Sequence, residues 1–206
     1  RWWHRARVNE GLLSYGSSPA KNPFNEPVFE TKTAAGYESG MDDSPMYIDV
    51  PFNKKKHTLE LQDVGLNSLY ISDCRALAEM AAIIGRDKEQ NELENRANQY
   101  TSKMEYLWSE GFGAYLNYRT DADSLSKRVS PTIFYPLLAR AGDKKQKDRI
   151  LEHYYNPDEF YGEWMLPSTT RNDPLFEHQR YWKGAIWPPL NFLNYLSLRQ
   201  AGYYDA

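Results

Sequence analysis

One stretch, residues 37–47, gathers acidic side chains in a pattern that suits proton transfer. Glu38, Asp42 and Asp43 place three carboxylates within six residues. Because Gly40 and a nearby proline interrupt helices, the stretch is predicted to be a loop, and loops held by rigid helices often carry catalytic groups. Carboxylates this close raise one another's proton affinity, which can keep one of them protonated near neutral pH. The alternative is a solvated acidic turn that caps a helix.

Aromatic residues are the second feature with chemical meaning. The chain holds 6 Trp and 16 Tyr, and aromatics make up 15% of it. Aromatic rings stack on the flat apolar faces of sugars while their polar edges form hydrogen bonds. The alternative is an aromatic-rich core. The single cysteine, Cys74, excludes an internal disulfide and is predicted to be a small core residue. The four histidines lack metal-ligand spacing, so neither metal nor cofactor is expected.

The whole chain is consistent with a single domain, residues 1–206. Its net charge of −3 and its pI near 5.9 give no reason to expect nucleic acid or a membrane as partner. No apolar run approaches the roughly 20 residues that span a bilayer. The sequence opens with Arg1 rather than Met, so we expect it to be a piece of a larger protein, and its localisation cannot be predicted.

Hydrophobic periodicity predicts helices joined by short turns. The expected helices are about 63–84, 88–109, 130–141, 144–155 and 188–200, with glycines or Asn-Pro at several of their ends. Short links between successive helices imply antiparallel neighbours. Residues 16–61 and 158–187 are long, aromatic and irregular, which is typical of functional loops. The prediction is an all-α array of helical hairpins with its long loops on one rim.

Five stretches in order resemble glycoside hydrolase family 63, whose catalytic domain is an (α/α)6 barrel related to that of trehalases. They are Glu38-Ser39-Gly40-Met41-Asp42, residues 63–69 (DVGLNSL), residues 130–138 (SPTIFYPLL), residues 162–164 with 171–174 (GEW and RNDP), and residues 181–187 (YWKGAIW). Each motif alone is weak, but five in order are specific. The resemblance implies that residues 1–206 are an incomplete, central portion of such a barrel.

The resemblance also implies hydrolysis of α-linked glucosides or similar oligosaccharides with inversion at the anomeric carbon. In that reaction one carboxylic acid protonates the leaving oxygen and a second carboxylate activates water. Asp42 matches the general acid, and Asp43 is given a supporting role. The general base of the family is expected beyond residue 206, so residues 1–206 alone are expected to be inactive.

The sugar subsite that the resemblance implies is aromatic. Trp182 and Trp187 would wall it, with Trp164 as a further candidate, and Tyr181 would bond a sugar hydroxyl. Gly40 would let the backbone approach the sugar closely. The alternative for the indole rings is ordinary packing at the start of a helix.

Supporting roles fall to charged residues of the same motifs. Glu38 belongs to the acidic stretch, and Glu163 either supports the site or pairs with Arg171 as a structural bridge. Lys183 stands where the family usually has Arg, which puts a bidentate contact there in doubt.

Other functions remain open. A non-catalytic helical domain that binds carbohydrate or protein through its aromatic loops is the main alternative. Trehalase or mannosylglycerate-type hydrolysis are the alternatives among enzymes. The uneven loop lengths disfavour a solenoid scaffold. The expected partner is an α-linked glycoside, and bare apolar flanks of the hairpins predict self-association or association with the rest of a barrel.

Overall fold

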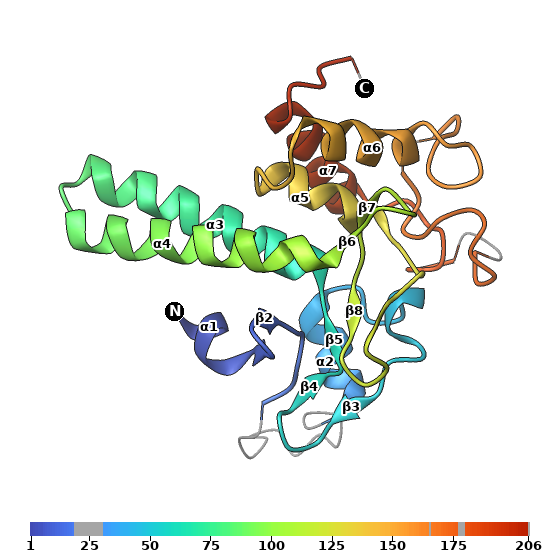
Figure 1. Ribbon diagram of the computed structural model, residues 1–206. Coiled ribbons are helices and arrows are strands. Elements are labelled where there is room, and N and C mark those ends of the chain that lie inside the picture. Colours follow the sequence, from blue (N-terminus) through green and yellow to red (C-terminus); the bar gives the residue numbers. More distant parts are fainter. Residues whose placement is uncertain (19–30, 165, 177–179, 206) are drawn as a thin grey trace.

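The computed structural model describes residues 1–18, 31–164, 166–176 and 180–205. Figure 1 shows a long hairpin of two helices, α3 (Val64–Ile83) and α4 (Asp87–Met104), projecting from a body of shorter helices and small sheets. The side chain of Asp63 caps α3 by accepting a hydrogen bond from the backbone N–H of Leu66 at 2.8 Å. The predicted helix at 63–84 is confirmed, whereas the next one ends earlier than expected, at Met104.

The second hairpin is shorter than the first. Residues 131–138 form a 3-10 turn, η3 (Pro131–Phe134), followed by the single helical turn α5 (Tyr135–Leu138), and α6 (Lys144–Tyr154) returns. The expected cap at Ser130 is present, because its hydroxyl accepts from the N–H of Thr132. Pro136 removes a backbone donor inside the segment, which accounts for its irregular winding.

The last helix, α7 (Pro188–Gln200), completes the predicted set. α3 packs on α4 and α5, and α5 packs on α7. Between them lies one large core, with fully buried rings such as Tyr100, Tyr115, Phe134 and Phe160. Cys74 is buried in this core, as predicted. Helices make up 47% of the structure, so the scaffold is mostly helical, as expected.

The long loops are tied together by very short antiparallel ladders, which the all-α prediction did not include. β1 (Val8–Asn9) pairs with β2 (Leu12–Leu13), β3 (Phe52–Asn53) with β4 (Thr58–Leu59), and β6 (Trp108–Ser109) with β7 (Ala114–Tyr115). A three-stranded sheet has the order β5 (Leu61–Gln62), β8 (Tyr118–Arg119) and β9 (Ser124–Leu125), with Leu61 opposite Arg119. Two-residue strands are too short to show an alternating pattern, which explains why an all-α prediction was incomplete.

The acidic stretch is only partly a loop, which corrects the prediction. A short helix α1 (Trp2–Ala6) opens the chain, and α2 (Lys32–Ser39) includes Glu38. Gly40 does not interrupt this helix but ends it, because it adopts the left-handed conformation with φ 69° that a C-cap requires. A turn at 41–44 and the 3-10 turn η1 (Pro45–Tyr47) follow. Asp42 and Asp43 therefore lie in a turn that α2 supports.

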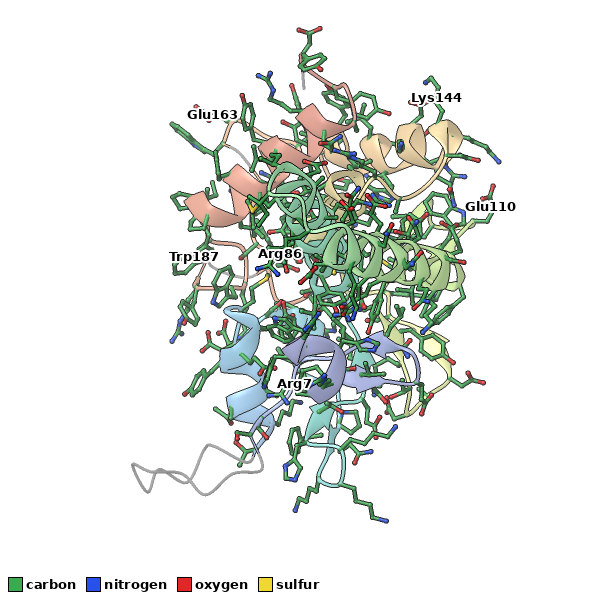
Figure 2. All side chains as sticks on the ribbon, turned by 90° about the vertical axis from the view of Figure 1, so that its left-hand side faces the viewer. Arg7, Arg86, Glu110, Lys144, Glu163 and Trp187 are labelled. Carbon is green, nitrogen blue, oxygen red and sulfur yellow. The ribbon has the colours of Figure 1, made fainter. Side chains whose placement is uncertain are left out.

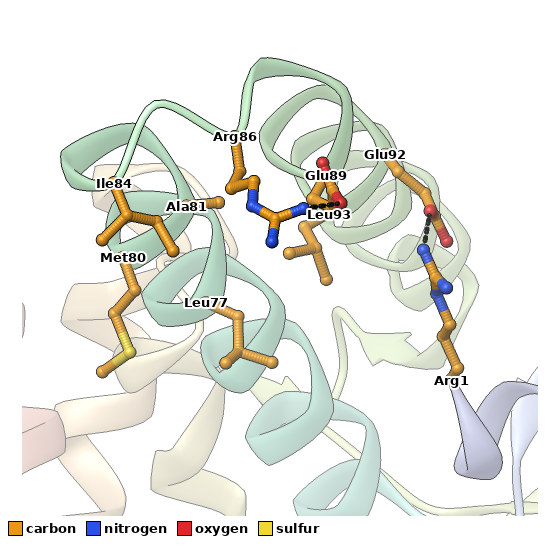
Figure 3. Close-up of a pocket in the computed structure, with 9 residues that line it drawn as sticks. All are labelled: Arg1, Leu77, Met80, Ala81, Ile84, Arg86, Glu89, Glu92 and Leu93. Carbon is orange, nitrogen blue, oxygen red and sulfur yellow. Dashed lines mark hydrogen bonds and ion pairs between the residues drawn. The ribbon is translucent and has the colours of Figure 1, made fainter.

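The far end of the α3–α4 hairpin exposes apolar side chains. Met80 is 60% and Ile83 84% exposed, and Leu77 and Ile84 lie beside them. Leu77, Met80 and Ile84 border a groove of about 450 Å³. Figure 3 shows the residues that line it, with the ion pairs Arg1–Glu92 and Arg86–Glu89 among them. None of the helices in the described residues is both long and apolar enough to cross a membrane.

We expect residues 1–206 alone to self-associate through this apolar end. Water-exposed apolar surface of this kind favours association. Substituting Met80→Lys together with Ile83→Lys should lower the average mass measured by light scattering at high concentration. The pair Asn91→Lys and Gln99→Lys adds the same charge to exposed positions of α4 and serves as control. A concentration-independent monomer for the unsubstituted chain would contradict the expectation.

Candidate active site

The turn that carries Asp42 rests directly on α2. A Cβ atom at Gly36 would lie 3.0 Å from the carbonyl oxygen of Asp42 and 3.3 Å from its Cα, so the absence of a side chain at Gly36 lets the turn pack against the helix. The Ser39 hydroxyl donates to the carbonyl of Gly36 at 2.6 Å and accepts from the N–H of Met41 at 3.0 Å. Gly40 faces open space. The turn is thus fixed on one side and accessible on the other.

Asp42 meets a residue from the far end of the chain. The hydroxyl of Tyr181, 139 positions away, donates to Oδ1 of Asp42 at 2.9 Å. This hydrogen bond raises the pKa of Tyr181 above its usual range. Tyr181 has φ 49°, in the left-handed region that non-glycine residues seldom adopt and that is enriched at functional sites. Its carbonyl accepts from Nε1 of Trp187 at 3.0 Å, which helps to hold the turn in this conformation.

Asp43 is held quite differently from Asp42. Its Oδ1 accepts from the backbone N–H of Trp182 at 3.2 Å, and its Oδ2 lies 3.1 Å from Nζ of Lys183. Both carboxylate oxygens of Asp43 are thus engaged by the 181–187 loop. Asp43 therefore joins the acidic turn to the 181–187 loop, and Lys183 makes a single-point contact rather than a bidentate one.

The aromatic residues of the 181–187 loop form a cluster. The rings of Trp182 and Trp187 stack with centroids 4.5 Å apart and an interplanar angle of 16°, and Tyr181 meets Trp187 edge-on at 5.6 Å. Both indoles also pack against the small buried cluster that includes Met41 and Tyr47. Because each indole covers a face of the other, only the outer faces of the stacked pair are left for a ligand.

A groove of about 390 Å³ runs beside Asp42. Its lining residues are Lys32, Thr33, Gly36, Tyr37, Asp42, Asp43, Ser44, Tyr47 and Ile48. The groove presents both carboxylates, several hydroxyl groups and an exposed aromatic ring, which are the groups that bind polyhydroxylated molecules. Asp42 is half-buried at its edge. The arrangement suits transfer of a proton from Asp42 to a ligand oxygen.

The structure does not bring Glu163 to this cluster, and Trp164 lies on the surface. Trp164 is 69% exposed, and Glu163 is exposed as well. Figure 2 shows Glu163 well apart from Trp187. The guanidinium of Arg171 lies against Gly162, where a Cβ would come within 2.5 Å of Nη2, and donates to the carbonyl of Glu159 at 3.3 Å.

Three ion pairs near the site escaped the sequence analysis. Glu38 does not line the groove and accepts hydrogen bonds from Arg7. Nη1 of Arg128 lies 3.4 Å from Oδ1 of the buried Asp173, and its Nε lies 3.5 Å from Oδ2 of Asp49. The only signal for such pairs in a sequence is that a buried charge requires an opposite one, and this does not say which residue supplies it. In the described residues, no three His, Cys, Asp or Glu side chains gather as metal ligands would.

Comparisons with known proteins agree with this architecture. A family model described as the mannosylglycerate hydrolase MGH1-like glycoside hydrolase domain matches residues 1–206. Mannosylglycerate hydrolase of Rubrobacter radiotolerans is 28% identical over 203 residues, which cover 97% of this chain and 43% of that protein. Glucosylglycerate hydrolase of Mycolicibacterium hassiacum is 28% identical over 155 residues, which cover 66% of this chain and 32% of that protein. The chain thus spans less than half the length of these curated relatives.

Solved structures place the helices in a known fold. The GH63 mannosylglycerate hydrolase of Thermus thermophilus in complex with glucose superposes with a TM-score of 0.76 at 21% identity, over 99% of this chain and 54% of that one. The neutral trehalase Nth1 of Saccharomyces cerevisiae superposes with a TM-score of 0.66 at 21% identity, over 89% and 34%. The described structure is therefore a portion of the (α/α)6 fold, with short antiparallel ladders in its loops.

Proposed function

Because the chain belongs to the mannosylglycerate hydrolase MGH1-like glycoside hydrolase domain family, we propose that it supplies the proton donor, Asp42, of an inverting glycosidase. The carboxylic acid of Asp42 protonates the bridging oxygen as the bond to the anomeric carbon breaks. A second carboxylate activates water on the opposite face of the sugar, roughly 6.5 to 9.5 Å away. Asp43 and Lys183 position the loop, and the outer face of the Trp182–Trp187 pair borders the sugar.

The observation that carries this proposal is the different bonding of the two adjacent aspartates. Asp43 is committed to an ion pair and a backbone N–H. Asp42 has a neutral hydroxyl partner, Tyr181, and borders the groove. A general acid must reach the ligand oxygen with its carboxyl group, whereas both oxygens of Asp43 are engaged by the 181–187 loop. This favours Asp42 over its neighbour.

The water-activating base is proposed to come from another part of the full-length protein. Asp173 is buried beside Arg128, and Glu163 lies apart from the groove. Neither position suits a base that acts across a sugar from Asp42. Residues 1–206 alone are accordingly proposed to be inactive.

The substrate is proposed to be a small α-hexoside. The similarity to a mannosylglycerate hydrolase and to a glucosylglycerate hydrolase favours hexosylglycerates over α-linked glucosides in general. A solved relative with D-glycerate bound points the same way. The groove beside Asp42 is of the size that suits a compact ligand.

A glycoside screen on the full-length protein, with the product followed by proton NMR, tests this function. We expect an α-hexosylglycerate to be hydrolysed with the β-anomer of the free hexose appearing first. Appearance of the α-anomer first would contradict inversion. No hydrolysis of any α-hexoside, together with saturable carbohydrate binding, would instead favour a non-catalytic binding domain.

A further inference from the structure

We infer that Arg7 is a positioning residue for the proton donor, acting through Glu38 and α2. The inference rests on the proposed role of Asp42. It assigns a function to the first residues of the chain, which lie far from the groove in sequence and which neither the acidic motif nor the aromatic loop includes.

The contact between Arg7 and Glu38 is bidentate and largely buried. Nε of Arg7 donates to Oε2 of Glu38 at 2.8 Å and to Oε1 at 3.0 Å, and Nη2 donates to Oε1 at 2.6 Å. Arg7 is 4% exposed, and its guanidinium lies 4.7 Å from the ring of Trp2. The backbone N–H of Gly16 donates to Oε2 of Glu38 at 2.7 Å. A forked pair of this kind fixes orientation as well as distance.

The surroundings of the pair leave it little freedom. A Cβ atom at Gly16 would lie 2.2 Å from the carbonyl of His57 and 3.0 Å from Nε of Arg7. The backbone of Gly16 also forms a β-bridge with Thr58, and the backbone N–H of Ser17 donates to the carbonyl of His57 at 2.8 Å. Arg7 is therefore enclosed between α1, the 14–17 segment and the last turn of α2, and Glu38 is anchored by two separate chain segments.

Glu38, which Arg7 anchors, belongs to the same helix, α2, as Gly36, on which the turn of Asp42 rests. Glu38 lies in the last turn of α2, and Asp42 follows four residues later, packed against Gly36 of that helix. From the other side Asp42 is reached by Tyr181 at 2.9 Å. A rotation of the end of α2 would move Asp42 relative to Tyr181 and to any ligand. Because a displacement of about 1 Å can cost about 10²-fold in rate, the Arg7–Glu38 contact matters for proton transfer from Asp42.

The test compares two substrates of the full-length protein. One is the glycoside whose leaving oxygen needs a proton, and the other is the dinitrophenyl glycoside of the same sugar, whose leaving group departs without one. We expect Arg7→Lys, which loses the forked contact, to lower kcat about 10- to 100-fold on the first substrate. On the second we expect a change below about 3-fold, with KM little changed for both.

Controls separate positioning from damage to the fold. Glu38→Gln keeps the size and the acceptor oxygen of the side chain but weakens the ion pair, so it should show the same selectivity for the proton-requiring substrate. It replaces Arg7→Lys if that variant fails to fold. Arg96→Lys alters another arginine–glutamate pair, on α4 and remote from α2, and should change neither rate. Equal losses on both substrates, or no loss, would overturn the inference. If Asp42→Asn also lacks this selectivity, the proposed function itself is wrong.

Discussion

Asp42→Asn should lower kcat on a hexosylglycerate by about 10³-fold or more in the full-length protein, with KM changed only a few-fold. An amide can still accept the hydrogen bond from Tyr181, so the geometry of the turn should survive. The amide cannot release a proton to the leaving oxygen, and general acid catalysis contributes roughly 10² to 10⁴ in rate. Asp43→Asn should cost far less, about 10-fold, because it only weakens the contact with Lys183.

Comparing two leaving groups, one that needs a proton and one that does not, again isolates the contribution of the proton donor. The Asp42→Asn variant should hydrolyse the dinitrophenyl glycoside within about 10-fold of the unsubstituted enzyme, because that step needs no acid. Asp43→Asn should show no such dependence on leaving group. If the two variants behave in the opposite sense, the roles of the two aspartates are exchanged. If neither depends on the leaving group, the proton donor lies elsewhere.

The sequence predicted the scaffold better than the loops for a physical reason. α3 repeats apolar residues over 20 residues, and a pattern that long is unmistakable. α2 has only 8 residues and is followed closely by a glycine and a proline, so local sequence preferences predicted a loop there instead of a helix. Its existence depends on the Thr31 cap and on burial of Ala35 and Gly36 against the rest of the body. A helix held by tertiary contacts of this kind is invisible to propensity.

The resemblance placed the acidic turn and the 181–187 loop in one candidate site, but it did not predict how their side chains meet. The resemblance named Asp42, Tyr181, Trp182 and Trp187 together, and the structure brings them into contact. Which aspartate meets the lysine and which meets the tyrosine depends on the turn after Gly40, and short-range rules do not specify it. The stacking of the two indoles likewise depends on how the 181–187 loop packs against the cluster that includes Met41 and Tyr47, and short-range sequence patterns do not show such packing.

Asp63→Ala should destabilise the fold more than the other substitutions considered, by about 3 kcal/mol. Asp63 is 2% exposed, caps α3 through the N–H of Leu66, and accepts from the hydroxyl of the buried Tyr47 at 3.1 Å. Loss of a cap costs about 0.5–2 kcal/mol, and a buried hydroxyl without a partner costs roughly 1–3 kcal/mol more. The total free energy of unfolding of a domain is only about 5–15 kcal/mol. Urea unfolding followed by circular dichroism measures the difference.

Asp63→Asn is the matched variant, and its effect should depend on pH. Burial raises the pKa of Asp63 in the folded protein, whereas in the unfolded chain it is about 3.9. The folded state thus holds this proton more tightly, so the stability gained from protonated Asp63 is complete below about pH 4 and is lost as pH rises through the folded pKa. Asparagine keeps the cap and does not titrate. The free energy of unfolding of the Asn variant should therefore rise relative to that of the unsubstituted protein as pH increases from about 4 through the folded pKa. A difference of the opposite sign would mean that the ionised carboxylate, rather than the neutral acid, is the form that the core prefers.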